Sequence, residues 1–164
     1  MGTRLQWRGV VCCVAFGLSV AALGCGGAPH QHEFLNEAVP VTGKVTVDGK
    51  PLARATVTFT PDITSTGGRQ ALAITKDDGS YELSTAVPGL SLEQSKGALP
   101  GDYAVTVSCI AMPDGEPLPA DIIDEHDAVS RGAKQLVPQR FTKIETTKLR
   151  AKVAAPAMQH DLAM

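Results

Sequence analysis

The chain has 164 residues, of which 43% are hydrophobic, 20% are charged and 4% are aromatic. This is the length of one domain, or of one domain with a targeting segment, and it is too short for two full domains. The balance of apolar and charged residues excludes a disordered chain and a multispan membrane protein. A net charge of −2 leaves no basic surface of the kind that nucleic-acid binding requires, so we expect no nucleic acid as a partner.

Residues 1–24 have the organisation of a signal peptide. Arg4 and Arg8 give a basic start without acidic residues, and the segment from Val10 to Leu23 is then almost wholly apolar. This segment is shorter than the roughly 18 to 20 apolar residues that span a bilayer comfortably. We therefore expect export and cleavage, with an uncleaved N-terminal anchor or a buried helix as the alternative.

The end of this segment, Ala22-Leu23-Gly24-Cys25, resembles the bacterial lipobox. In that motif the cysteine becomes the first mature residue and carries diacylglycerol on its sulfur. Ala22 and Leu23 stand in swapped order relative to the usual motif, and Ala22-x-Gly24 also suits ordinary signal peptidase. We expect Cys25 to be the lipidation site, with simple cleavage and no lipid as the alternative. Full acylation would supply the more than one chain that stable membrane attachment takes.

The expected location follows from this lipid. The chain would be a lipid-anchored membrane protein of the cell envelope, facing the periplasm or the exterior. Gly26, and not Asp, follows the cysteine. By the general rule for Gram-negative lipoproteins, this favours the outer membrane over the inner.

The cysteines that remain after cleavage are too few for a disulfide framework. Cys12 and Cys13 lie in the apolar run of the signal, so the mature chain keeps Cys25 and Cys109. If Cys25 carries lipid, Cys109 is a free thiol. We expect Cys109 to behave as a small buried hydrophobic residue. A disulfide between the two is the alternative.

Residues 25–38 have no sustained apolar period and are predicted to form a tether. Residues 39–164 are predicted to form one β domain, because from Val39 onward several short segments alternate apolar and polar residues, as in strands with one buried and one wet face. Turn residues such as Asp48-Gly49 and Asp77-Asp78-Gly79 separate the strands. The expected strands are 41–47, 56–60, 70–75, 80–84, 103–110, 148–153 and 158–162.

About seven short strands at this spacing predict an all-β fold, an antiparallel β-sandwich of the transthyretin or immunoglobulin type. The segment 119–137 is the best candidate for a helix, and we expect one short turn there. Lys148, Arg150 and Lys152 form a cationic row on the 148–153 strand. A solvated strand face explains this row, with contact to anionic lipid or glycan as the alternative.

A series of short segments stands out in the second part of the chain: 41–52, 55–61, 75–83, 97–107, and 136–141 with 146–149. Together they resemble the carboxypeptidase regulatory-like domain as it occurs in small bacterial lipoproteins. The resemblance covers about residues 39–153 and implies a transthyretin-like β-sandwich without catalytic residues. At Arg54 the family often has glycine, so we expect a turn here that does not require positive φ.

Candidate chemical sites are weak in this sequence. His30-x-His32 has no third metal ligand at a fixed spacing, and His126 is expected on a wet loop. Asp77-Asp78-Gly79 with Glu82 does not have the spacing of an EF-hand loop, which favours a turn over a calcium site. No nucleophile elbow or phosphate-binding loop is present in the sequence. We expect no enzyme, no catalytic residue, no metal and no cofactor.

Two functions of different class remain. The first is a non-catalytic, lipid-anchored envelope module, structural or in contact with envelope proteins or glycans through its loops. The long loops 86–99 and 111–137 are the expected contact regions. The second is an envelope carrier that binds a small ligand or carbohydrate. The scarcity of aromatic residues argues against sugar stacking in that carrier.

Overall fold

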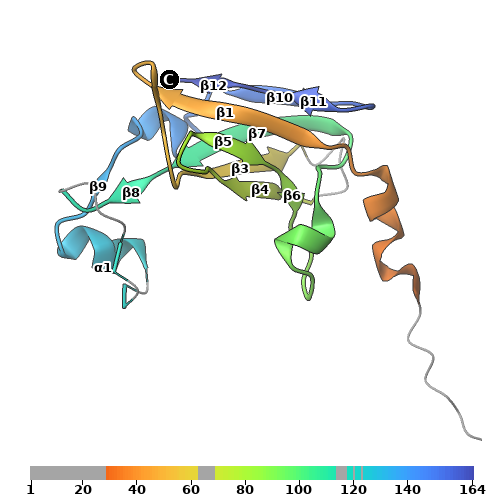
Figure 1. Ribbon diagram of the computed structural model, residues 1–164, viewed down its shortest axis with the longest axis horizontal. Helices are drawn as coiled ribbons and strands as arrows, with labels where there is room; N and C mark the ends of the chain where they lie inside the picture. The colour runs from red at the N-terminus through yellow and green to blue at the C-terminus, as the bar shows by residue number, and fades with distance from the viewer. Residues whose placement is uncertain (1–28, 63–68, 114–117, 120, 123) are drawn as a thin grey trace, which may run out of the picture.

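The computed structural model describes residues 29–62, 69–113, 118–119, 121–122 and 124–164. These residues form the predicted all-β sandwich, made of short strands with little helix (Figure 1). The strands are β1 Val41–Val47, β2 Lys50–Pro51, β3 Thr56–Pro61, β4 Ala71–Ile74, β5 Ser80–Glu82, β6 Ser84–Thr85, β7 Gly101–Ser108, β8 Ile110–Ala111, β9 Lys134–Gln135, β10 Arg150–Val153, β11 Met158–Gln159 and β12 Leu162–Ala163. The helices are the 3-10 helices η1 Pro29–Glu37, η2 Leu92–Ser95 and η3 Gln139–Phe141 and the α-helix α1 Glu125–Ser130.

Two sheets pack face to face, and a small ribbon extends from one of them. In the first sheet, β1 pairs with β2 and β5 on one edge and with β11 and β12 on the other. The second sheet has the order β10-β7-β3-β4-β6, and β8 and β9 form the ribbon. The pairs of β1 with β11 and β12 are parallel, and all the other strand pairs are antiparallel. The predicted antiparallel sandwich is therefore confirmed everywhere except at the C-terminal strands.

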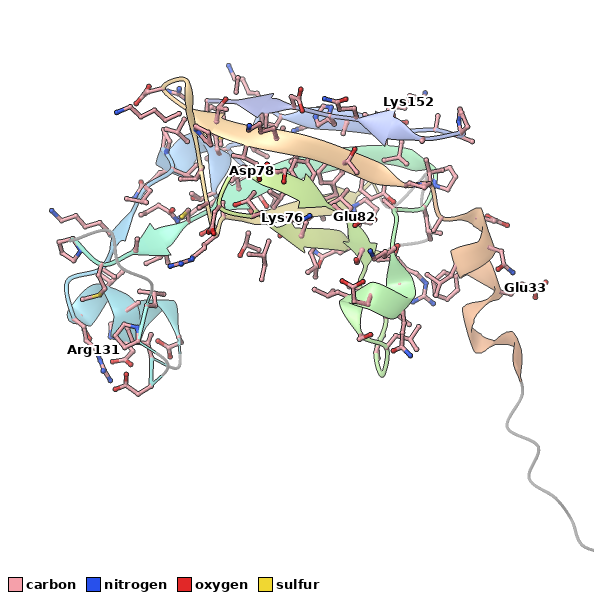
Figure 2. The ribbon with its side chains drawn as sticks, viewed as in Figure 1. Glu33, Lys76, Asp78, Glu82, Arg131 and Lys152 are labelled. Carbon is pink, nitrogen blue, oxygen red and sulfur yellow. The ribbon has the colours of Figure 1, made fainter. Side chains whose placement is uncertain are left out.

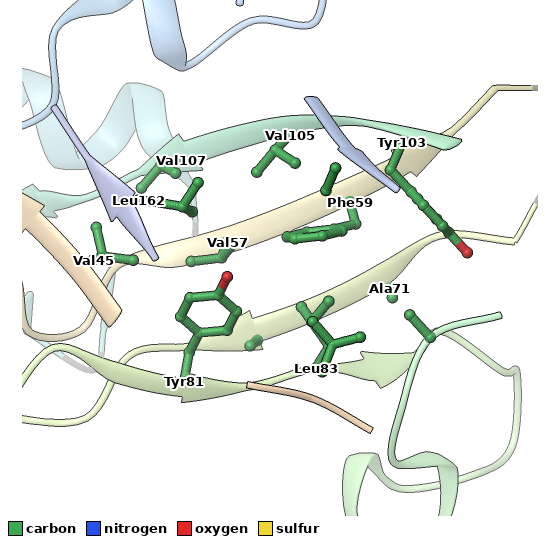
Figure 3. Packing of buried hydrophobic residues seen from close by; sticks show 14 of the residues in the cluster. Val45, Val57, Phe59, Ala71, Tyr81, Leu83, Tyr103, Val105, Val107 and Leu162 are labelled. Carbon is green, nitrogen blue, oxygen red and sulfur yellow. The ribbon is translucent and has the colours of Figure 1, made fainter. Parts of the chain in front are cut away.

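The core lies between the two sheets and contains the inward rows that the alternation predicts. Val57 and Phe59 of β3 and Val105 and Val107 of β7 are all fully buried (Figure 3). From the opposite sheet, β1 contributes Val45 to the same interior. Burial of such side chains removes apolar area from water, at about 25 cal/mol for each Å², and is the main force that holds the sheets together.

Two tyrosines fill the core and place their hydroxyls at its rim. Tyr103 is 1% exposed, and its hydroxyl donates to the Leu99 carbonyl at 2.8 Å. Tyr81 is 2% exposed, and its hydroxyl donates to the His160 carbonyl at 2.5 Å. Burial raises the pKa of Tyr103 to about 12 and raises the pKa of Tyr81 further. Both hydroxyls therefore stay protonated donors at neutral pH.

The C-terminal strands approach β1 most closely at Gly43. A Cβ on Gly43 would overlap the His160 carbonyl oxygen and lie 2.8 Å from the Tyr81 ring. Only glycine allows the two chain segments to come this close. The absence of a side chain at residue 43 is therefore a packing requirement. Val41 and Val45, two positions before and after it on β1, do carry side chains, and these are buried in the core.

The hydrogen-bond ladder between β1 and the C-terminal strands is interrupted at the same place. The His160 N–H donates to the Thr42 carbonyl at 2.8 Å, as the ladder requires. The Lys44 N–H, however, donates to the Asp161 carboxylate at 2.9 Å. The His160 carbonyl is thereby free to turn toward the Tyr81 hydroxyl, which is its donor.

The His160 ring lies inside this junction. Its centroid is 6.0 Å from that of Phe59, in an edge-to-face arrangement that aromatic pairs favour. Burial lowers the pKa of His160, and the Asp161 carboxylate opposes that shift. The imidazole is therefore held in its neutral form against the core.

The predicted tether is partly a helix that packs on the sandwich. Residues 29–37 form η1, where the sequence showed no regular period. The Arg69 guanidinium lies 3.9 Å from the centroid of the Phe34 ring, and Val39 and Ala98 exchange two backbone hydrogen bonds of 2.8 and 2.9 Å. These contacts hold the segment before β1 against the body of the domain.

The expectation for Arg54 is wrong. Its φ is 57°, so this residue adopts the left-handed conformation that the turn was expected to avoid. The Arg54 N–H donates to the Thr75 carbonyl at 3.0 Å, and the Ala55 N–H donates to the Thr75 hydroxyl at 2.8 Å. This hydroxyl donates in turn to the Leu52 carbonyl at 2.7 Å. The bonds to Thr75 fix the turn, whatever residue occupies position 54.

The short helix expected within residues 119–137 is confirmed as α1. The Asp124 side chain caps its start by accepting from the Asp127 N–H at 2.8 Å. Arg131 follows the helix and forms ion pairs with Asp121 at 2.7 Å and Asp127 at 3.0 Å. His126 is exposed, as expected, but lies on this helix and not on a loop.

We predict that Gly43→Ala destabilises the protein by about 2 kcal/mol, because the new methyl group must displace the C-terminal strand or the Tyr81 ring. Urea unfolding measures the change. Thr42→Ala, at an exposed neighbour on the opposite face of β1, is the control and should shift stability by less than about 0.5 kcal/mol. Equal stability of the two variants would contradict the close approach at Gly43.

We predict that His160 makes stability depend on pH. Because burial lowers its folded-state pKa, the unfolded chain binds this proton more readily. The contribution of the neutral ring to stability is complete above the pKa that histidine has in the unfolded chain, about 6.5. It is lost as the pH falls toward the folded-state pKa. The melting temperature should therefore fall more steeply between about pH 7.5 and pH 5.5 in the unmodified protein than in His160→Gln. His126→Gln, at an exposed position, should keep the steep dependence.

Candidate functional site

The residue with the sharpest sequence prediction, Cys25, lies outside the described residues, as do the residues of the predicted signal peptide. No helix in the described ranges is long and apolar enough to cross a membrane. His30 and His32 lie within η1. In the part of the chain that the structure describes, no three His, Cys, Asp or Glu residues gather as metal ligands.

The segment considered for calcium forms the predicted turn. Gly79 has a φ of 78°, and the Asp78 carboxylate accepts from both the N–H and the hydroxyl of Ser80, at 3.0 and 2.6 Å. These two hydrogen bonds are the main reason why the pKa of Asp78 is lowered. The Asp78 carboxylate thus stabilises the turn locally.

Cys109 is confirmed as a buried free thiol, 4% exposed. Its sulfur lies 3.5 Å from the Ala53 carbonyl oxygen, and its N–H donates to the Gln135 side chain at 2.8 Å. Burial raises the pKa of Cys109, so the thiol stays protonated at neutral pH. A thiol in this state is a poor nucleophile.

The predicted cationic row lies on and beside the edge strand β10, with Lys148, Arg150 and Lys152 all exposed. Arg150 donates to the carbonyls of Thr147 and Leu149 at 3.0 and 2.8 Å. The Lys152 ammonium lies 3.9 Å from the Asp102 carboxylate. Exposed pairs of this kind contribute little to stability.

The two long loops predicted as contact regions differ in structure. The 86–99 loop is held against the sandwich, because the Thr85 hydroxyl donates to the Gly97 carbonyl and the Ser84 hydroxyl to the Leu92 carbonyl, both at 2.8 Å. The described part of the 111–137 loop contains α1 and β9 and projects from one end of the molecule (Figure 1).

A groove lies at the base of this projection, and we call it the β8 groove. It has a volume of about 620 Å³. Ile74 is 59% exposed and Leu136 is 47% exposed, and both line this one groove. Large apolar side chains that are exposed together are typical of interaction sites. The main apolar lining residues of the β8 groove are Leu52, Ile74, Ile110, Leu118 and Leu136.

Two charges of opposite sign lie on the lining of the β8 groove. Arg54 and Asp77 are both exposed, and neither forms an ion pair with another described residue. Arg54 reaches this position because of the left-handed turn that Thr75 fixes. The groove therefore offers one positive and one negative charge beside an apolar surface.

The β8 groove and the N-terminal segment lie at opposite ends of the domain. In Figure 1, η1 descends from the right end, whereas β8, β9 and α1 lie at the left end. The labelled residues Glu33 and Arg131 show the same separation in Figure 2. A partner bound in the groove would therefore lie far from the point at which the chain leads toward Cys25.

A second, polar hollow of about 430 Å³ lies on the outer face of the first sheet. It offers amide, ammonium and carboxylate groups. Tyr81 is the aromatic residue among its described lining residues, and its ring is buried, at 2% exposure. Figure 2 shows Lys76 and Glu82 near this face. The polar lining residues include Lys44, Lys76, Glu82, Gln159 and Asp161.

The comparisons with known proteins identify no family. No protein-family model matches the sequence, and no curated protein matches it. Among solved structures, the chain is similar to a 9R-lipoxygenase from Cyanothece PCC8801, with 13% identity over 79% of this chain and a TM-score of 0.31. The match spans 16% of the lipoxygenase chain. A similarity this low carries no argument about function.

The residues of the β8 groove were not predicted as a set. They come from five separate segments, so no local motif joins them. Two partial signals were present in the sequence. The long loop 111–137, expected as a contact region, supplies Ala111, Leu118 and Leu136 to the lining, and Arg54 stands where the resembled family often has glycine. Arg54 matters because its side chain lines the groove. The turn conformation that the sequence suggested for this residue was wrong.

We predict that Arg54→Gly raises the free energy of unfolding by about 1 kcal/mol, because glycine adopts positive φ without the steric cost that other residues meet. Urea unfolding checks this. Lys148→Gly replaces an exposed cationic residue whose φ is not positive, and should lower stability, since glycine loses more backbone entropy on folding. A loss of stability in Arg54→Gly would contradict the strained turn.

Proposed function

We propose that this protein is a non-catalytic, lipid-anchored β-sandwich of the cell envelope that contacts a partner protein through the β8 groove. The observation that carries this proposal is the exposed apolar groove beside β8. β8 lies at the end of the domain opposite η1 (Figure 1). Exposed apolar surfaces with a polar rim are typical of protein interaction sites.

The short distance along the chain between Cys25 and η1 supports this arrangement. The four residues from Cys25 to Ala28 span at most about 14 Å when fully extended. Since η1 is held to the domain through Phe34 and Val39, a lipid on Cys25 would keep the η1 end close to the membrane. The β8 groove would then be directed away from the membrane.

A non-catalytic role is supported by the state of the reactive groups. Cys109 is buried and protonated, and the neutral His160 ring packs on Phe59. His126 is exposed on α1 and forms no ion pair with the described residues. These positions suit a stable domain better than an arrangement of nucleophile, base and orienting group.

The polar hollow on the first sheet favours a second candidate function, an envelope carrier for a small ligand or carbohydrate. Lys44, Glu82 and Asp161 could bind hydroxyl groups there. Among the described residues that line this hollow, no aromatic ring is exposed, so a sugar has no ring on which to stack. The β8 groove therefore remains the stronger candidate site. Binding of a defined sugar on a glycan array, lost in Asp161→Ala and kept in Arg54→Asp, would favour the carrier.

The anchor is tested by labelling with palmitate in a Gram-negative host, followed by membrane fractionation. We expect label in the membrane fraction for the unmodified chain and for Cys109→Ser. Cys25→Ser should lose the label, because it lacks the sulfur that carries the diacylglycerol. Unlabelled, freely secreted wild-type protein, or label that persists in Cys25→Ser, would refute the lipid anchor.

A further inference from the structure

The backbone of β8 has an edge that is open toward the β8 groove. In β7, the Val105 N–H donates to the Leu149 carbonyl at 3.1 Å, so the backbone groups of Val105 point toward β10. Four residues later, Cys109 presents its groups on the same side and accepts from the Leu136 N–H at 2.8 Å, beside β9. Because successive residues of a strand direct their N–H and C=O groups to opposite edges, those of Ile110 point away from β9.

No described strand covers this second edge of β8. β3 pairs with β7 only as far as the register pair Thr56 and Ser108, because the preceding chain turns away at Arg54. Within the described residues, β8 pairs with β9 alone. The gap where β3 would continue is lined by Ile110 and Arg54, both of which line the β8 groove. An open edge with unpaired N–H and C=O groups is a template for another strand.

The side chains around this edge define what suits it. Ile74 and Leu136 present apolar surface, and the described lining residues include no aromatic ring on which a glycan could stack. Arg54 and Asp77 offer one positive and one negative charge without ion-pair partners among the described residues. A peptide main chain satisfies the edge, and its alternate side chains meet the apolar lining and the two charges.

We propose that the β8 groove binds an extended segment of a partner protein, which adds a strand to β8 beside Ile110. The segment has apolar residues that face Ile74 and Leu136, an acidic residue that pairs with Arg54 and a basic residue that pairs with Asp77. This inference deepens the proposed function and rests on it, because it names the partner class for the same groove.

The test uses the mature full chain in detergent micelles and a library of random linear octapeptides. We expect enrichment of peptides that combine apolar residues with one acidic and one basic residue. Arg54→Asp, a residue type that tolerates positive φ, should weaken the selected peptides about tenfold. The charge change Lys148→Asp, on the cationic row beside β10, should leave the affinity unchanged.

Hydrogen exchange tests the added strand independently of any variant. A bound peptide should slow exchange of the Ile110 amide, because that N–H gains an acceptor. Ile110→Pro removes the donor and should weaken binding at least tenfold, whereas Ile110→Val should bind normally. If Ile110→Pro fails to fold, the exchange measurement on the unmodified chain decides.

Several results would overturn the inference: no enriched sequence class, enriched peptides that leave the Ile110 amide unprotected, or equal binding to the unmodified chain and Arg54→Asp. Failure of the inference is distinguishable from failure of the proposed function. Palmitate on Cys25 without peptide binding removes only the extended segment as the occupant of the groove and leaves the anchored domain standing. Peptide binding without palmitate removes only the lipid anchor.

Discussion

The close approach of two distant chain segments at Gly43 is the constraint on which the fold depends. β1 is the middle strand of its sheet, because residues 158–163 cover one of its edges. That coverage is possible only where residue 43 lacks a side chain. The same contact directs the His160 carbonyl to the Tyr81 hydroxyl and the His160 ring to Phe59, so the junction joins the first sheet to the core.

The sequence predicted which side chains of the longer strands are buried, because this depends on local alternation. Three of the expected strands are divided in the structure: 80–84 into β5 and β6, 103–110 into β7 and β8, and 158–162 into β11 and β12. Val57 and Phe59, and likewise Val105 and Val107, are buried as their period of two requires. The turn at Asp48 also agrees, with a φ of 49°. Alternation states which face of a strand is buried, but it does not state which strand lies beside it. The alternation pattern therefore could not predict that β1 pairs in parallel with β11 and β12.

The remaining differences have tertiary causes. η1 has no amphipathic pattern. Its Phe34 ring lies against Arg69, and Val39, which follows the helix, bonds to Ala98; the local sequence cannot reveal either contact. Arg54 has positive φ because the carbonyl and hydroxyl of Thr75, 21 positions later, bind the turn. The groove is likewise a product of the fold. By contrast, the expectation for Cys25 depends on a contiguous motif, which is why the sequence alone could supply it.

The junction at Gly43 also has a consequence for the order of folding. The Lys44 N–H meets an acceptor 117 positions away along the chain, so β1 cannot obtain its second neighbour by any local step. Proteins dominated by such distant pairings fold slowly. Until residues 158–163 arrive, one edge of β1 stays open to other chains. The sheet around β1 is therefore complete only when the C-terminal strands have paired with it.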